Sequence, residues 1–268
     1  MIPNILSIAG SDPSGGAGIQ ADIKAIAAMG GYAMAAITAL TAQNTRGVSA
    51  VQMVAVGFVA AQIRAVRDDI RVDAVKIGML GTPEIIGAVA DALDGLDAPV
   101  VLDPVMVAKS GDRLLSTDAV AALAERLVPR ATVITPNLPE AADLLGADAA
   151  TDTDGMAAQA ETLCARGARA VLIKGGHLAG PACPDLLVHN GGTERFDAPR
   201  HRTTNTHGTG CSFSSALACA LGKGHTLPEA VAEAKAWLSG AIAAADTLSV
   251  GTGHGPVHHF HNLKGKHG

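Results

Sequence analysis

Aromatic residues are scarce in this sequence, and their scarcity excludes some classes of ligand. Only 2% of the 268 residues are Phe, Trp or Tyr, so base-stacking platforms for single-stranded nucleic acid are not expected. Lys and Arg number 20 against 25 Asp and Glu, giving a formal net charge of -5, and the basic residues form no cluster along the chain. Proteins that bind duplexes carry a basic face, so we expect no nucleic acid partner.

Cysteine is also scarce, and its spacing excludes a disulfide framework. The four residues Cys164, Cys183, Cys211 and Cys219 form no CxxC pair, which fits neither a structural zinc site nor a stapled fold. No run of 18 apolar residues without glycine or charge suggests a membrane span, and the first residues show no signal-peptide pattern. We therefore expect a cytoplasmic protein that does not contact the membrane.

Short β-branched runs alternate with helical patterns along the chain. Strands are expected at residues 4–10, 32–41, 73–80, 98–106, 131–137 and 168–176, and a hairpin at 185–199. Helices are expected at residues 17–30, 56–70, 82–96, 116–129, 137–145, 156–167, 211–223 and 227–247. Repeated strand–helix units with apolar strands predict a mainly parallel sheet covered on both faces. With no linker and no fixed-period repeat, residues 1–268 are predicted to form one three-layer α/β/α domain.

The loop at residues 9–22 is rich in glycine, serine and aspartate. Residues 16–21 match the loose GxGxxA form of a dinucleotide fingerprint, but no acidic residue ends the next strand, and a P-loop would need Lys after Gly15. The loop is either a set of plain turns or a close backbone approach to a ligand. Gln43, expected just after a strand, is either a solvated loop residue or pairs in two places with an aminopyrimidine edge.

Polar residues follow neighbouring strands of the expected sheet. Asp103 and Glu140 lie just past two adjacent strand ends, where carboxylates suit Mg²⁺ held partly through water. Asn137 and Glu140 are three residues apart at a helix start, so they can face the same way, and Glu140 could equally balance the helix dipole. Lys174 ends an apolar strand before two glycines, a position from which a cation reaches phosphate oxygens.

The segment NTHGTGC, residues 205–211, joins a glycine-rich loop to an apolar helix. With His207 four residues before Cys211, it permits three interpretations: a cysteine nucleophile with its base, a metal site, or a cradle for phosphate. A cysteine protease brings these two residues from separate segments, and no second pair of zinc ligands is evident. Gly208 and Gly210 bring amides together at a helix start, where an anion is stabilised, so the phosphate cradle is favoured.

Together these motifs resemble the hydroxymethylpyrimidine/phosphomethylpyrimidine kinases of thiamine biosynthesis, in the ribokinase-like superfamily. The resemblance spans residues 8–261 and rests on IAGSDPSGGAGIQAD, TALTAQNTRGV, KIGMLGT, LDPVMVAKSGDRLL, TPNLPEA, KGGHL, NTHGTGCSFSSALA, EAKAWLSGAI and GPVHHFH. It implies a ribokinase-like fold that uses ATP and Mg²⁺, and a homodimer, which is common in the superfamily. The implied reaction phosphorylates 4-amino-5-hydroxymethyl-2-methylpyrimidine to its monophosphate and then to its diphosphate.

The resemblance also implies roles for individual residues. The positions that match the pyrimidine pocket are Gly10, Gln43, Met79 and Val105, with Asp22 as a further candidate. The positions that match the ATP phosphates and the metal are Asn137, Glu140 and Lys174, to which the strand-end argument adds Asp103. The positions that match the anion hole are Gly208, Thr209, Gly210 and Cys211, and residues 108–112 resemble the lid over the substrate.

Sugar kinases of this superfamily carry an Asp where Cys211 stands, and that Asp serves as the general base. We expect a helix N-terminus to lower the pKa of the Cys211 thiol, and a loose phosphoryl-transfer transition state needs little base strength. A neutral thiol would not repel a phosphate acceptor, so Cys211 suits both an alcohol and a phosphate.

Three other functions remain as alternatives. A pyridoxal or pyridoxine kinase shares the fold and the anion hole, and Gln43 with the glycine-rich first loop favours the aminopyrimidine. A non-catalytic sensor of the pyrimidine or of ATP would be supported by loss of Lys174 or Glu140, and both are present. A cysteine hydrolase would be revealed by thiol alkylation and ester turnover.

Overall fold

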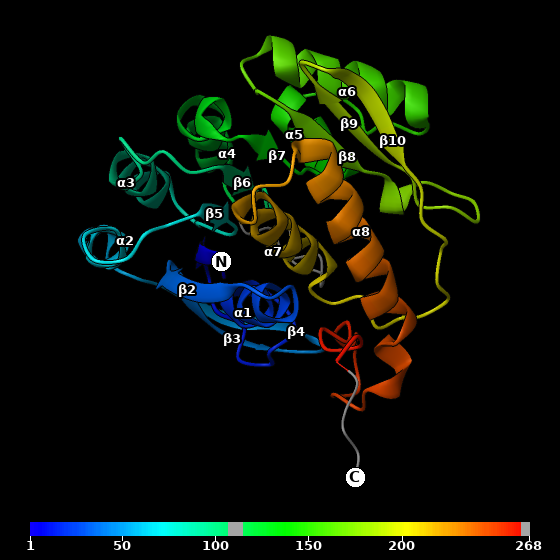
Figure 1. Cartoon of the computed structure of the whole chain (residues 1–268), viewed down its shortest axis with the longest axis horizontal. Coiled ribbons are helices and arrows are strands. Elements are labelled where there is room, and N and C mark those ends of the chain that lie inside the picture. Colours follow the sequence, from blue (N-terminus) through cyan, green and yellow to red (C-terminus); the bar gives the residue numbers. More distant parts are fainter. Residues whose placement is uncertain (107–114, 264–268) are drawn as a thin grey trace.

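One eight-stranded sheet runs through the computed structural model, which describes residues 1–106 and 115–263 (Figure 1). Its strand order is β10-β9-β8-β7-β6-β5-β1-β2. The strands are β1 (Asn4–Ala9), β2 (Tyr32–Ile37), β5 (Ala74–Ile77), β6 (Val100–Leu102), β7 (Val133–Ile134), β8 (Val171–Lys174), β9 (Asp185–His189) and β10 (Gly192–Phe196). The predicted lid at residues 108–112 lies outside the described residues.

The sheet is mainly parallel, as the alternating strand and helix patterns predict. The strands from β2 across to β8 pair in parallel, and the hairpin of β9 and β10 adds two antiparallel pairings at one edge. The apolar runs form buried strands because both faces of the sheet are covered: every residue of β5 and β6 is buried. The carboxyl ends of the parallel strands therefore share one edge, where ligands of such sheets bind.

Helices cover the two faces of the sheet in separate layers (Figure 1). One layer holds α2 (Val56–Arg67), α3 (Pro83–Ala92), α4 (Thr117–Arg126), α5 (Leu138–Leu145) and α6 (Thr153–Ala165). The other holds α1 (Gly18–Ala28), α7 (Thr209–Gly222) and α8 (Leu227–Ala243). This is the predicted three-layer α/β/α arrangement, and small residues line the α7 side, where ten consecutive residues are buried.

The expected strand at residues 32–41 is two strands, because the chain leaves the main sheet at Thr38. The Thr38 amide donates to the Ala9 carbonyl at 3.0 Å, and its hydroxyl donates to the Met79 carbonyl at 2.7 Å. Beyond it, β3 (Ala39–Asn44) pairs with β4 (Gly47–Met53) in an antiparallel ribbon, and with no other described strand. Gln43 is thus not a residue after a strand: it lies inside β3, at a register shift.

Residues 251–261 form a strap that ties distant parts of the chain together. The Gly253 amide donates to the Thr45 hydroxyl at 3.1 Å, on the turn between β3 and β4. Farther along, His259 Nε2 and Ser212 Oγ are 2.9 Å apart, which fastens the strap to α7. Burial lowers the pKa of His259 to about 4, so its ring is neutral at physiological pH.

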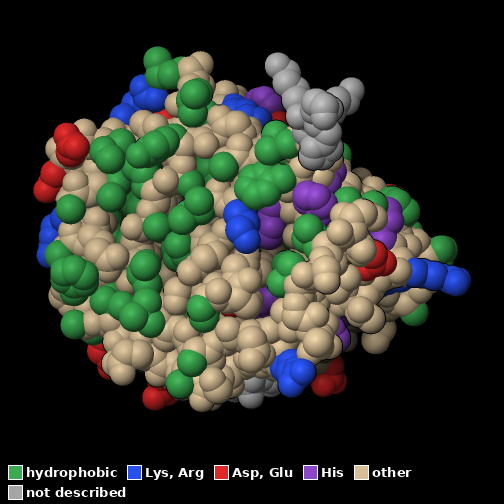
Figure 2. Space-filling model, turned by 90° about the horizontal axis from the view of Figure 1, so that it is seen from below, with side chains coloured by type: hydrophobic (Ala, Val, Ile, Leu, Met, Phe, Trp, Pro, Cys, Tyr) green, Lys and Arg blue, Asp and Glu red, His purple; other side chains and the backbone are tan. Residues whose placement is uncertain are grey.

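Two properties of the structure concern the expected partners. Within residues 1–106 and 115–263, no helix combines the length and the apolar character needed to cross a membrane. The face in Figure 2 carries Lys and Arg side chains that are scattered singly among apolar and uncharged ones. That face offers no basic patch of the kind that duplex binding requires.

Candidate active site

Two carboxylates share one ammonium at the carboxyl edge of the sheet. Asp103 directly follows β6, and Lys174 is the last residue of β8. Lys174 Nζ donates to Asp103 Oδ1 at 2.7 Å and lies 3.9 Å from Glu140 Oε2. Asp103 is 1% exposed and Glu140 is 6% exposed. Among the described residues, the site therefore holds an excess of buried negative charge beside the single cation of Lys174.

Glu140 is held in place by the start of α5. The Asn137 side chain accepts from the Glu140 amide at 2.9 Å, and Glu140 Oε2 accepts from the Asn137 amide at 2.8 Å, which completes a capping box. The Lys174 amide donates to the Pro136 carbonyl at 2.9 Å, so the same turn is fixed to β8. Glu140 thus both takes part in the cap of α5 and lies near Lys174, and the Asn137 side chain is the other half of that cap.

The titration of these groups reflects the imbalance of charge. Burial raises the pKa of Glu140 to about 7; the Lys174 charge opposes this shift and the Asp103 charge reinforces it. Burial lowers the pKa of Lys174, but Asp103 and Glu140 more than offset it, so the pKa of the lysine is raised. The Glu140 carboxylate therefore takes up a proton near neutral pH, because Lys174 alone does not balance its charge and that of Asp103. Two such oxygen donors fit Mg²⁺, which takes one or two carboxylates and completes its shell with water and phosphate.

The amino end of α7 faces the same cluster. Gly208 precedes the helix with φ of +76°, a left-handed conformation that favours glycine, and no described side chain caps the first turn. A Cβ at Gly210 would lie 3.4 Å from both Asp103 Oδ2 and Lys174 Nζ. The amides at the start of a helix have no partner within it, so this turn presents donors and a positive dipole end beside Lys174.

Cys211 lies in that first turn, and its thiol differs from expectation. Burial raises the pKa of Cys211 to about 11, and the Lys76 charge, which lowers it, does not compensate, because Asp22 and Asp103 raise it further. The expected lowering by the helix N-terminus is therefore wrong in direction, since desolvation and two carboxylates outweigh it. The thiol is neutral at physiological pH, which disfavours the cysteine-hydrolase alternative because the thiolate is the nucleophile.

A second lysine–carboxylate cluster lies beneath Cys211 and was missed by sequence reasoning. Lys76 Nζ donates to both oxygens of Asp22 at 2.9 Å. The Ser7 hydroxyl donates to Asp22 at 2.6 Å and the Ser215 hydroxyl at 2.8 Å. All four residues are 0% exposed. These four bonds match the four lone-pair positions of a carboxylate, so Asp22 supports the site from below and has no lone pair left for a pyrimidine.

The remaining residues predicted to bind the pyrimidine lie near the same edge. A Cβ at Gly10 would lie 2.5 Å from Met79 Cε, so these two residues are in contact. The Thr41 hydroxyl lies 3.3 Å from Gln43 Oε1 and 2.9 Å from the Ser11 carbonyl. Gln43 is thereby connected to the loop that begins at Gly10.

Val105 also follows the end of β6, two residues beyond Asp103. Its amide donates to the Asp103 carbonyl at 2.8 Å, which turns the chain sharply just past the strand. This turn keeps Val105 next to Asp103, on the same edge of the sheet as the rest of the site. Thr209 is the first residue of α7, and its hydroxyl donates to the Thr206 carbonyl at 2.7 Å.

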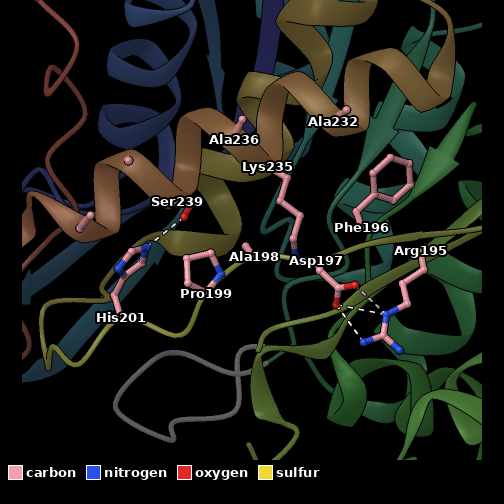
Figure 3. A pocket seen from close by; sticks show the side chains of 12 residues that line it. Arg195, Phe196, Asp197, Ala198, Pro199, His201, Ala232, Lys235, Ala236 and Ser239 are labelled. Atoms are coloured by element: carbon pink, nitrogen blue, oxygen red, sulfur yellow. Dashed lines mark hydrogen bonds and ion pairs between the residues drawn. The ribbon is translucent and has the colours of Figure 1, made fainter. Parts of the chain in front are cut away.

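A pocket of about 630 Å³ opens beside the cluster, between α8 and the chain that follows β10 (Figure 3). Lys235 of α8 projects toward it and pairs with Asp185 Oδ2 at 2.6 Å. Asp185 in turn accepts from the Gly175 amide at 3.0 Å, next to Lys174. Two antiparallel pairings make β10 run in the direction of β8, so its carboxyl end lies at the same edge of the sheet as Lys174.

Comparisons with known proteins show which family the chain belongs to. The sequence profile of the family described as phosphomethylpyrimidine kinase matches residues 12–258. The hydroxymethylpyrimidine/phosphomethylpyrimidine kinase of Escherichia coli (strain K12) is 55% identical over 259 residues, which cover 96% of this chain and 97% of that protein.

Solved structures show the same fold. An ADP complex of Bacillus subtilis pyridoxal kinase superposes with a TM-score of 0.89 at 38% identity, covering 97% of this chain and 98% of that one. A phosphomethylpyrimidine kinase from Clostridium difficile 630 superposes with a TM-score of 0.79 at 41% identity, covering 90% and 100%. The architecture is the predicted ribokinase-like fold. The chain belongs to the phosphomethylpyrimidine kinase family.

Proposed function

We propose that this protein transfers a phosphoryl group from ATP to the hydroxyl of 4-amino-5-hydroxymethyl-2-methylpyrimidine, and then a second one to the monophosphate, in thiamine biosynthesis. The observation that carries the proposal is the position of Lys174. Its ammonium stands between two buried carboxylates and in front of the uncapped amino end of α7. Family membership and the names of the relatives favour this substrate over pyridoxal.

The chemistry follows from charge. The transferred phosphoryl group carries negative charge on its oxygens, and catalysis consists mainly of positioning and electrostatic stabilisation. We assign the amides of Gly208, Thr209 and Gly210 to those oxygens, as donors fixed in place before reaction. Lys174 lies close to Gly210 and supplies a positive charge to the same oxygens.

Asp103 and Glu140 are the proposed ligands of Mg²⁺, with Asn137 fixing the orientation of Glu140. Bound Mg²⁺ would neutralise charge on the ATP phosphates. In the protein alone, Lys174 holds both carboxylates near their working positions. The high pKa of Glu140 keeps the cost of its burial low until a second cation arrives.

Cys211 is assigned to the acceptor, beside the anion cradle. An ionised residue at this position would repel a phosphate acceptor, whereas a neutral thiol does not. The raised pKa of Cys211 supports this role, because the thiol keeps its proton over the whole physiological range. We therefore propose that it orients both acceptors through its S–H group and is not the strong base that an Asp would be.

Recognition of the pyrimidine is assigned to Gly10, Met79, Val105 and Gln43. Gly10 and Met79 form one apolar contact, and Gln43 lies on the β3–β4 ribbon that joins this loop through Thr41. A glutamine amide offers both a donor and an acceptor, which an aminopyrimidine edge matches.

The pocket between α8 and the end of β10 is the proposed seat of the ATP base and sugar. It opens on the edge that carries Lys174, and its α8 side is lined mainly by small residues such as Ala232, Ala236 and Ser239 (Figure 3). The related pyridoxal kinase was solved with ADP.

We further propose that the protein is a cytoplasmic homodimer. Leu40 and Val51 of the β3–β4 ribbon, 51% and 45% exposed, offer apolar surface for the contact between the two copies. Light scattering, which measures the mass of the protein in solution, tests this proposal.

Phosphorus NMR of the protein with ATP, Mg²⁺ and the hydroxymethylpyrimidine tests the activity. Signals of the pyrimidine monophosphate and then the diphosphate are expected, with ADP formed in step. Pyridoxal serves as the competing acceptor and should be phosphorylated more slowly. Unchanged ATP would contradict the proposal and leave the sensor alternative, and faster phosphorylation of pyridoxal would reassign the substrate.

A further inference from the structure

His207 is a titratable residue of the NTHGTGC segment that the proposed mechanism does not use. Its ring is buried, 5% exposed, and Nε2 donates to Asp12 Oδ2 at 2.8 Å. The two residues are 195 positions apart, and Asp12 is itself 1% exposed. A general base for Cys211 would use the other ring nitrogen, Nδ1, and among the described residues the His207 ring makes no hydrogen bond to Cys211. The pair calls for a different role.

Asp12 organises the whole first loop around that bond. One of its oxygens accepts from the Ser14 amide at 2.9 Å and from the Ser14 hydroxyl at 2.7 Å. The other accepts from the Gly16 amide at 3.1 Å, from the Ala17 amide at 2.8 Å, and from His207. Burial raises the pKa of Asp12, but the hydrogen bond from His207 and those within the loop outweigh it and lower the pKa to about 2.

Two glycines make the contact between the loops possible. A Cβ at Gly16 would collide with the His207 ring, and a Cβ at Gly208 would collide with the Gly16 carbonyl oxygen. The first loop is therefore pressed directly against the residue that precedes α7. On its other side His207 is held by the strap, because its amide donates to the Gly255 carbonyl at 3.0 Å.

We infer that Asp12 and His207 form a clip that positions the anion cradle at the start of α7, and that both are positioning residues for phosphoryl transfer. The inference rests on the proposed function. The clip fixes the backbone immediately before Gly208, so it sets where the amides of Thr209 and Gly210 point. Loss of the clip should impair the transition state, which needs these amides in exact places, more than ground-state binding.

Two substitutions of His207 separate positioning from general stability. Gln places an amide nitrogen close to the position of Nε2 and keeps the bond to Asp12, whereas Asn is too short to reach. His207→Asn should lower kcat about 100-fold, the cost typical of about 1 Å of misplacement, with KM for ATP and for the pyrimidine changed less than threefold. His207→Gln should recover kcat to within about tenfold of the wild type.

His189→Asn is the matched control, because His189 also pairs with a carboxylate, that of Glu194 at 3.1 Å, but in the β9–β10 hairpin. Its kcat should equal that of the wild type. Equal kcat for His207→Asn and wild type would overturn the inference, as would a Gln variant no better than Asn.

Hydrogen exchange on the unliganded protein tests the clip without reference to activity. In His207→Asn, peptides over residues 11–18 and 203–212 should exchange faster together, and in His207→Gln both should stay slow. Faster exchange in one segment alone would overturn the clip. Absence of turnover in the wild type would overturn the proposed function and the catalytic half of the inference, while the exchange result would still decide whether the loops move as one.

Discussion

Two buried lysine–carboxylate clusters lie on neighbouring parts of the sheet and differ in how completely they are satisfied. Lys76 and Asp22 are 0% exposed, and Ser7 and Ser215 fill the remaining positions on the carboxylate. The Lys174 side chain is 16% exposed and faces two carboxylates, Asp103 and Glu140. We call the first cluster closed, because it is shielded from solvent and its one positive charge matches its one negative charge. We call the second cluster open, because its described carboxylates outnumber its ammonium group and its lysine is in part exposed to solvent.

The difference follows from position along a strand. Lys76 lies within β5, and its Nζ is 2.7 Å from where a Cβ at Gly78 would be, so the side chain is enclosed by the sheet and by α1 and α7. Lys174 is the last residue of β8. A buried ion pair in the middle of a strand therefore supports structure, whereas the same chemistry at the strand's carboxyl end is available to a ligand.

The largest expected effect comes from breaking the closed cluster. Lys76→Met leaves the Asp22 charge buried without its partner, and such losses cost about 3–5 kcal/mol of unfolding free energy. Urea denaturation measures the change. The double variant Lys76→Met, Asp22→Asn should recover part of it, because the unpaired charge is gone. A loss below about 1 kcal/mol would mean that the cluster is not closed in solution.

Breaking the open cluster should affect turnover more than stability. Lys174→Met removes the cation beside the phosphate cradle, and kcat should fall about 10²–10³-fold, as for other groups that stabilise developing negative charge. Steady-state kinetics at saturating ATP measures it. Lys223→Met, which removes a surface ion pair with Glu233, is the matched control and should leave kcat unchanged. A fall in kcat that is ten times smaller than this would show that Lys174 does not act on the transferred phosphate.

Glu140→Gln tests the charge of the open cluster alone, because it removes the unbalanced charge and keeps the shape of the side chain. The amide retains an oxygen to accept from Asn137, so α5 should remain capped. The Mg²⁺ concentration for half-maximal rate should rise about tenfold, since one carboxylate ligand is lost. Pyrimidine binding, measured by calorimetry, should not change. An unaltered Mg²⁺ titration would take Glu140 out of the metal site.

Cys211 lies between the two clusters and should give the smallest effect. Its pKa of about 11 means that the thiol stays protonated from pH 6 to 9 and the thiolate forms only above that range. Cys211→Ala should therefore slow each phosphorylation by less than about tenfold, below the 10²–10⁴-fold typical of a general base, and leave the pH profile unchanged. Loss of an ionisation near pH 8 in the variant would show that the thiol does act as a base.

Sequence patterns predicted most of the sheet, because both of its faces are covered and its strands are continuous apolar runs. They missed β4, whose residues are mainly exposed and show no apolar alternation. They also merged β2 with β3, since the break depends on Thr38 bonding to segments that are distant in the sequence. Patterns report burial, and they fail where long-range hydrogen bonds decide the path of the chain.

The strand-end carboxylates and Lys174 were predictable because parallel strands bring their carboxyl ends to one edge. The Lys76 cluster was not predicted, although a lysine in the middle of an apolar strand is a visible signal that some buried acid must balance it. The pKa of Cys211 could not be predicted, because the neighbouring carboxylates come from α1 and from the end of β6. His207 stands close to Cys211 in the sequence, yet its partner is Asp12.

The strap at residues 251–261 affects the order in which parts of the protein can fold during synthesis. A ribosome delivers Asp12 and the first loop 195 positions before His207, and the segment that backs His207 follows later still. The layer of α2 and α3 over β1, β2 and β5 can form while translation continues, because its residues all precede His207. The phosphate cradle cannot be completed until the strap has left the exit tunnel and fastened to Ser212. During synthesis, part of the sheet can therefore fold before the phosphate cradle is complete.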